Sequence, residues 1–87
     1  FMTLIPPLPH MATGFVLINV EPGSEIEVHK AASKMEFVSE VNVLFGDHDL
    51  IVKVEADSVG DIARMVVESI RSISGVMTTK TLACAEF

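Results

Sequence analysis

The order of strand-like and helix-like segments predicts an α+β fold, a ferredoxin-like βαββαβ sandwich. Two strand patterns follow each other directly in the middle of the chain, which indicates a hairpin, and a strand and a helix flank it on either side. Because β-α-β crossovers are right-handed, this order gives a four-stranded antiparallel sheet, in the order 4-1-3-2, with two helices on one face. The other face is left open, and we expect a second subunit to cover it, as in a dimeric α/β barrel.

The first strand is predicted over residues 14–20, a β-branched apolar run that ends in a Glu-Pro-Gly turn. Phe15 and Leu17 lie on one side of this strand. The other side carries Val16, Ile18 and Val20. A strand that is apolar on both sides needs cover on both, which is the main reason to expect the second subunit.

Each predicted helix has a recognisable start. The first begins at Glu25, because the hydroxyl of Ser24 can cap the free amides and acidic residues suit the positive helix end. Its apolar face is formed by Val28, Ala31, Ala32 and Met35. The second begins after Ser58, with Asp61 three residues on in the manner of a capping box, and Gly75 ends it. Its inner face comprises Ile62, Val66, Ser69, Ile70 and Ile73.

The remaining strands are predicted over residues 37–45, 49–56 and 76–85, with a tight turn at 46–48 between the first two. Leu50, Val52, Val54 and Ala56 alternate with Lys53 and Glu55. Val41, Val43 and Phe45 follow the same period of two. The last segment is rich in Thr and Val and has no breaker, which is typical of a strand.

Composition and charge narrow the classes of function. The 87 residues are 49% hydrophobic, more than one small core holds, which favours subunit association. Twelve acidic residues oppose six basic ones and no basic cluster occurs, so direct binding to nucleic acid or to an anionic membrane is not expected. No apolar run reaches the roughly 20 residues that span a bilayer. Cys84 has no partner for an internal disulfide and is expected in the core or an interface, in a reducing cytoplasm.

The first eleven residues are expected to lie outside the fold. Three prolines within four positions are incompatible with a regular helix or a central strand, and His10-Met11 is typical of the junction left by an expression vector. Residues 1–11 are therefore interpreted as a vector-derived or disordered tail, and residues 12–87 as the domain. A natural proline-rich arm that docks on a neighbour is the alternative.

The most polar cluster is the turn formed by Gly46, Asp47, His48 and Asp49. One interpretation is a ligand loop, in which backbone amides face the carboxylate of an amino acid and an acidic side chain faces its ammonium group. The other is an ordinary hairpin turn, in which Asp and Gly serve the turn geometry alone. Catalysis, a metal or another cofactor is not expected there, because adjacent turn residues rarely converge on one point. Threonines of the last strand offer further hydrogen-bonding groups but also suit a sheet.

Two segments resemble a known family. Residues 46–54 are similar to the Gly-x-Tyr-Asp-x-x-x-x-Val hairpin of the ligand-binding domain in the leucine-responsive regulatory protein/AsnC (Lrp/AsnC) transcription regulators. Residues 73–81, Ile-Ser-Gly-Val-Met-Thr-Thr-Lys-Thr, resemble that domain's Ile-x-Gly-Val-x-x-Thr-x-Thr signature. The order of the elements fits too, so the resemblance covers residues 13–86. His48 stands where the family has Tyr.

The resemblance implies a RAM domain (regulation of amino acid metabolism) that binds an amino-acid effector between subunits. The implied ligand-binding residues are Gly46, Asp47, His48, Asp49, Thr79 and Thr81. The resemblance also implies a homodimer through the sheets and a higher assembly of the octamer type. Because residues 1–11 cannot supply the family's helix-turn-helix domain, the chain is interpreted as a stand-alone domain that acts through effector-dependent assembly or DNA-binding relatives. The alternative is a small enzyme of the monooxygenase or isomerase type, which the lack of Trp and Tyr disfavours.

Overall fold

A computed structural model describes residues 12–84 of the chain. The predicted tail, residues 1–11, lies outside the described residues, as do the last three residues of the predicted domain. The elements are β1 (Ala12–Val20), α1 (Glu25–Ser33), β2 (Val38–Val43), β3 (Leu50–Ala56), α2 (Val59–Met65), the π-helical segment η1 (Val66–Ile70) and β4 (Val76–Ala83). Their order confirms the predicted βαββαβ sequence of elements.

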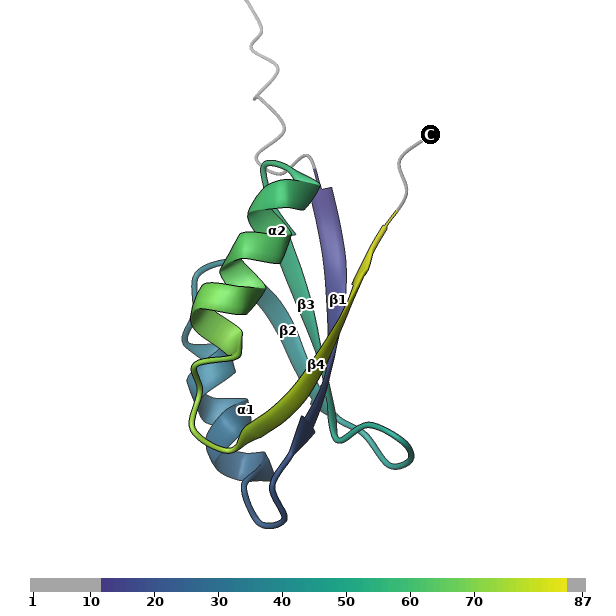
Figure 1. Ribbon diagram of the computed structural model, residues 1–87, viewed down its shortest axis with the longest axis vertical. Coiled ribbons are helices and arrows are strands. Elements are labelled where there is room, and N and C mark those ends of the chain that lie inside the picture. Colours follow the sequence, from purple (N-terminus) through teal and green to yellow (C-terminus); the bar gives the residue numbers. More distant parts are fainter. Residues whose placement is uncertain (1–11, 85–87) are drawn as a thin grey trace, which may run out of the picture.

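The strands form one antiparallel sheet in the order β2-β3-β1-β4, which confirms the predicted strand order. Both helices lie on the same side of this sheet and leave its other face open (Figure 1). The two outer strands, β2 and β4, are edges, and the two central strands carry the core. The fold is therefore the expected two-layer sandwich.

The core lies between the sheet and the helices. Alternate residues of β1 and β3 are buried, because successive side chains of a strand point to opposite faces. Ile18, Leu50 and Val52 are fully buried. The helices contribute Val28, Ala32, Ile62, Val66 and Ile70. Burial of one large aliphatic side chain stabilises a fold by about 1.5 to 3 kcal/mol, so each of these residues contributes substantially to the stability of the single chain.

The connection between β2 and β3 is longer than the predicted tight turn. It comprises residues 44–49 and is closed by the amide of Leu44, which donates to the carbonyl of Asp49 at 2.8 Å. Phe45, predicted in the strand, lies beyond its end and is fully exposed. Gly46 has a φ of 136°, a conformation that other residues rarely adopt, and this turns the chain before the period-two pattern can continue.

The cap predicted at Ser24 is wrong, although the helix begins at Glu25 as predicted. The hydroxyl of Ser24 makes no capping hydrogen bond, because the residue adopts φ −97° and ψ 0°, outside the extended conformation that a capping residue usually has. A Cβ atom built on Gly75 would lie 2.8 Å from the Cβ of Ser24. Glycine at position 75 therefore both adopts a positive φ of 100° and leaves space for the start of α1.

The second helix begins with half of the predicted capping box. The Ser58 hydroxyl accepts a hydrogen bond from the amide of Asp61 at 3.1 Å, whereas the carboxylate of Asp61 pairs with Arg64 at 2.8 Å. After Met65 the helix widens into η1, where the amide of Arg71 donates to the carbonyl of Val66. The sequence did not predict this change of period, but the inner residues Ile62, Val66 and Ile70 are buried as predicted.

The open face of the sheet carries apolar side chains that the single chain only half covers. The register places Phe15 beside Leu82 and Leu17 beside Ile51, and residues paired in an antiparallel sheet share a face. Leu82 is 46% exposed, and the other three are of intermediate burial. This face is continuous over three strands and has no covering layer within residues 12–84.

Candidate functional site

The loop of residues 44–49 is attached to the end of β1. The amide of Asp49 donates to the carbonyl of Ile18 at 2.9 Å, and the side-chain amide of Asn19 donates to the carbonyl of Asp47 at 3.0 Å. The loop projects beyond the sheet while its base is held against the adjacent strand (Figure 1). It therefore presents a defined arrangement of polar groups.

The carboxylate of Asp49 holds the strand end. Its Oδ2 accepts a hydrogen bond from the amide of Val20 at 2.9 Å. Pairing between β1 and β3 stops at Ile18 and Leu50, so no strand residue of β3 lies opposite Val20, and the carboxylate takes the place of a backbone carbonyl. Within residues 12–84, the other oxygen, Oδ1, has no hydrogen-bond partner and is available to a ligand.

The ring of His48 is held by a residue that the sequence reasoning missed. Its Nδ1 lies 2.7 Å from Oδ1 of Asn19, and both side chains are of intermediate burial. Asn19 was assigned only to an apolar strand. The signal in the sequence is the residue type. Asparagine is depleted in strands, so a single Asn within a β-branched run is expected to have a specific role.

The threonines lie on the far side of β1 from this loop. Thr79 pairs with Ile18 and Thr81 with Val16, so both threonines share the helix-covered side of the sheet. Thr78 instead pairs with Asn19 and lies on the open side. One chain thus brings together Asp47, His48 and Asp49 with Asn19, while β1 separates them from Thr79 and Thr81.

A family model described as the Lrp/AsnC ligand binding domain matches residues 13–86 of the chain. The chain belongs to this family. An uncharacterized HTH-type transcriptional regulator of Pyrococcus furiosus is 36% identical over 73 residues, which are 80% of this chain and 49% of that protein. The chain thus spans about half the length of the curated relatives it matches.

Solved structures agree with this assignment of the Lrp/AsnC domain. FFRP-DM1 is 36% identical, with a TM-score of 0.81, and the match covers 86% of this chain and 100% of that one. A transcriptional regulator of Neisseria meningitidis, solved as a complex with L-Met, has a TM-score of 0.80 at 14% identity, over 99% of this chain and 58% of that one. The second likeness shows the fold alone.

Gly46 forms the tip of the loop in this Lrp/AsnC domain. No atom lies within 4 Å of the position where a Cβ would stand, so the glycine is required by its positive φ and not by lack of space. Phe45, next to it, is 100% exposed. The tip is therefore open to solvent, and a ligand or a second subunit can approach it freely.

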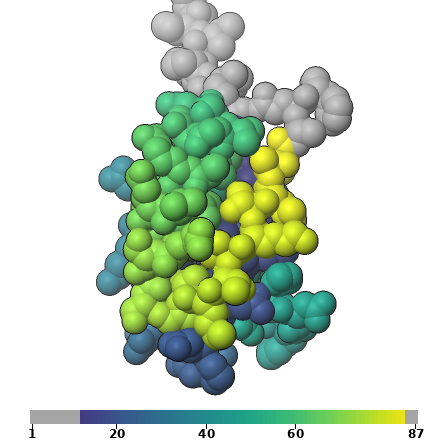
Figure 2. Space-filling model, in the orientation of Figure 1, coloured from purple at the N-terminus to yellow at the C-terminus, as the bar shows by residue number. Residues whose placement is uncertain are grey.

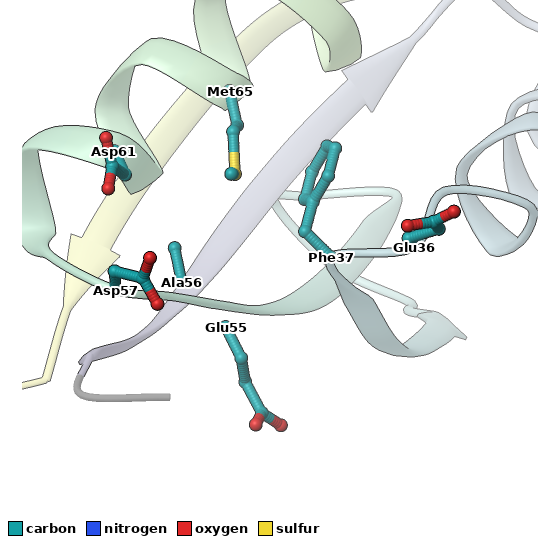
Figure 3. Close-up of a pocket in the computed structure, with 7 residues that line it drawn as sticks. All are labelled: Glu36, Phe37, Glu55, Ala56, Asp57, Asp61 and Met65. Atoms are coloured by element: carbon teal, nitrogen blue, oxygen red, sulfur yellow. The ribbon is translucent and has the colours of Figure 1, made fainter. Parts of the chain in front are cut away.

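The described cavity of the domain lies at the other end of β3 and does not form a comparable site. It has a volume of about 300 Å³ and is lined by Glu36, Phe37, Glu55, Ala56, Asp57, Asp61 and Met65. Its carboxylates do not converge (Figure 3). Glu55 points away from Phe37 and Met65, and its carboxylate accepts a hydrogen bond from the hydroxyl of Ser39. Asp61 is held by Arg64. No ligand chemistry follows from this arrangement.

The remaining candidates are exposed or partly exposed side chains. Cys84 is exposed beyond the end of β4, so of the two predicted positions, core or interface, the core is wrong, because β4 is an edge strand without cover there, and the interface stays a prediction. His29 is of intermediate burial on α1. Among residues 12–84, no three His, Cys, Asp or Glu side chains are placed to hold a metal ion. No helix in this part of the chain is long and apolar enough to cross a membrane.

Proposed function

We propose that this Lrp/AsnC domain binds an amino-acid effector at a cleft between two subunits. The observation that carries the proposal is the fixed loop of residues 44–49, which leaves the free oxygen of Asp49 and the ring of His48 available beside the end of β1. The family to which the chain belongs is a ligand-binding one, and a regulator with the same fold was solved with L-Met, which supports this class of ligand.

The chemistry of the loop suits a zwitterion. The carboxylates of Asp47 and Asp49 attract an α-ammonium group, and backbone amides near Gly46 can donate to an α-carboxylate. Hydroxyls of Thr79 and Thr81 complete the site. Since β1 separates these threonines from the loop within one chain, and they lie on the helix-covered side and not on the open face, we assign them to a neighbouring subunit of the higher assembly.

Assembly follows from the open face of the sheet. Phe15, Leu17, Ile51 and Leu82 form an apolar surface that a second copy can cover, and we infer a homodimer through this face and a higher assembly of the octamer type. An effector that binds between subunits stabilises the assembly that it contacts best. The domain would thereby modulate transcription in the cytoplasm, without catalysis, alone or with DNA-binding relatives of the Lrp/AsnC family.

Calorimetric titration with each of the twenty amino acids tests the proposal. We expect at least one of them to release heat and to raise the melting temperature of the protein, because a ligand that binds only the folded state stabilises it. If none of the twenty amino acids gives a heat of binding or changes the melting temperature, the proposed function is wrong.

A matched pair of variants separates the two roles of Asp49. Asp49→Asn keeps an oxygen that can accept from the amide of Val20 but removes the negative charge, so we expect weaker effector binding in a stable protein. Asp49→Ala also removes the hydrogen bond to Val20 and is expected to lower the free energy of unfolding by about 1 to 3 kcal/mol. Denaturant titration measures stability and calorimetry measures affinity. Unchanged affinity in Asp49→Asn would exclude a role of the charge.

A further inference from the structure

We propose that Asn19 fixes His48 in the tautomer that carries its proton on Nδ1, so that Nε2 is presented to the effector as a hydrogen-bond acceptor. This inference rests on the proposed function, because it names a determinant of specificity in the same site. Asn19 is a positioning residue in this scheme, and Nε2 of His48 is the atom that contacts the ligand.

The orientation of the Asn19 amide is the first step. Its nitrogen donates to the carbonyl of Asp47 at 3.0 Å. If the amide were turned over, its oxygen would face that carbonyl oxygen, and two acceptors would repel each other. The contact with Asp47 therefore directs the oxygen of Asn19 toward His48.

The tautomer of His48 follows from the second contact. The Asn19 oxygen can only accept a hydrogen bond, and it lies 2.7 Å from Nδ1 of His48. Nδ1 must therefore donate and carry a proton. A neutral imidazole has one N–H, so its other nitrogen, Nε2, is an acceptor. Within residues 12–84, Nε2 has no hydrogen-bond partner.

The class of ligand group follows from the neighbouring side chains. Asp47 and Asp49 carry carboxylates, which only accept when ionised, and Nε2 of His48 is an acceptor too, so these side chains of the loop offer acceptors and no charged donor to a ligand. A primary ammonium group has three N–H donors. The loop thus favours a ligand that approaches with its ammonium group, and it disfavours ligands whose amine is acylated.

Nitrogen-15 NMR of the full chain measures the tautomer directly. Under alkaline conditions in which imidazole is neutral, we expect His48 to show a protonated Nδ1 and an unprotonated Nε2. In Asn19→Ala the ring should change to a mixture of tautomers, because the acceptor for Nδ1 is lost. The signals of His29 serve as the control, since its ring is not bonded to Asn19. An unprotonated Nδ1 in the wild-type protein would overturn the proposal.

Effector affinity tests the role of Nε2. His48→Asn places an amide near the position of Nδ1 and can keep the contact with Asn19, but it removes Nε2. We expect roughly tenfold weaker binding of whichever amino acid the wild-type protein binds, the loss of about one hydrogen bond. His48→Gln, whose amide reaches toward the position of Nε2, should retain more of the affinity than His48→Asn. Equal affinities in the wild type and His48→Asn would exclude Nε2 as a ligand contact.

The two measurements separate this proposal from the proposed function. If none of the twenty amino acids binds, the proposed function fails and the ligand role of Nε2 fails with it, while the NMR result still decides the tautomer. If an amino acid binds but Nδ1 is unprotonated, the proposed function stands and this inference is wrong. N-acetylation of the amino acid that binds is expected to abolish binding, and full binding of the acetylated form would contradict the ammonium assignment.

Discussion

The two faces of the central sheet differ in burial although their residues are neighbours in the same strands. Ile18 and Val52 face the helices and are 0% exposed, whereas Leu17 and Ile51, one position away, are of intermediate burial on the open face. Leu17 and Ile18 have side chains of similar size and apolarity. The difference teaches that the covering layer, and not the residue type, decides which face becomes the core.

This difference also explains the high apolar content of a short chain. A domain of this size buries only about 60% of the surface of its unfolded chain, and one sheet face accounts for the core seen here. The remaining apolar residues of β1, β3 and β4 are concentrated on the open face. Figure 2 shows β4, in yellow, at the edge of the molecule beside α2 and η1. An apolar surface of this kind is typical of the core of a homodimer interface.

The largest effect is expected on the helix-covered face. Ile18→Ala should lower the free energy of unfolding by about 2 to 5 kcal/mol, because it removes a fully buried side chain and leaves a cavity between β1 and the helices. Leu17→Ala, one residue away, is the matched control and should cost clearly less in the single chain. Denaturant titration of both variants measures the difference. Equal losses would show that the two faces are equally packed.

A smaller effect is expected where the helix layer begins. Ser58→Ala removes the hydroxyl that accepts from the amide of Asp61, and a lost N-cap costs about 1 kcal/mol. Ser24→Ala is the matched control at the other helix, because Ser24 makes no capping hydrogen bond. Thermal unfolding should therefore rank Ser58→Ala below Ser24→Ala in stability. The reverse order would contradict the assignment of the caps.

The regular parts of the fold could be predicted from the sequence because their patterns have a single interpretation. The alternation of apolar and charged residues from Val52 to Ala56 predicted both the strand and its buried face. The strand pattern depends only on residues that are neighbours in the sequence, so it could be interpreted without knowledge of the fold. The second helix, by contrast, already ends at Ile70, before the predicted stop at Gly75, which lies in the turn that leads to β4.

The parts that could not be predicted depend on contacts distant in the sequence. Ser24 lies against Gly75, far along the chain, in a conformation (φ −97°, ψ 0°) from which it does not cap the helix. Phe45 leaves the strand because the loop closes through Leu44 and Asp49. In the candidate site, the loop itself was expected, but its support by Asn19 was not. Contact between an effector and Thr79 or Thr81 depends on the position of a second subunit, and that position is not encoded in any local pattern of one sequence.

Leu17→Lys is expected to have the smallest effect on the stability of the single chain. It is also the most direct test of the difference between the two faces. A partly exposed position tolerates such a change at a cost of about 0.5 kcal/mol, yet a charge at the centre of an apolar interface disfavours association. Sedimentation velocity should show a lower mass than for the wild type. The melting temperature should also lose its dependence on protein concentration, since that dependence arises only when folded chains associate.

Ala63→Lys, at an exposed position of α2, is the control and should keep both the mass and the concentration dependence. If Leu17→Lys instead keeps the wild-type mass, the open face is not the interface, and its half-buried side chains would need another explanation.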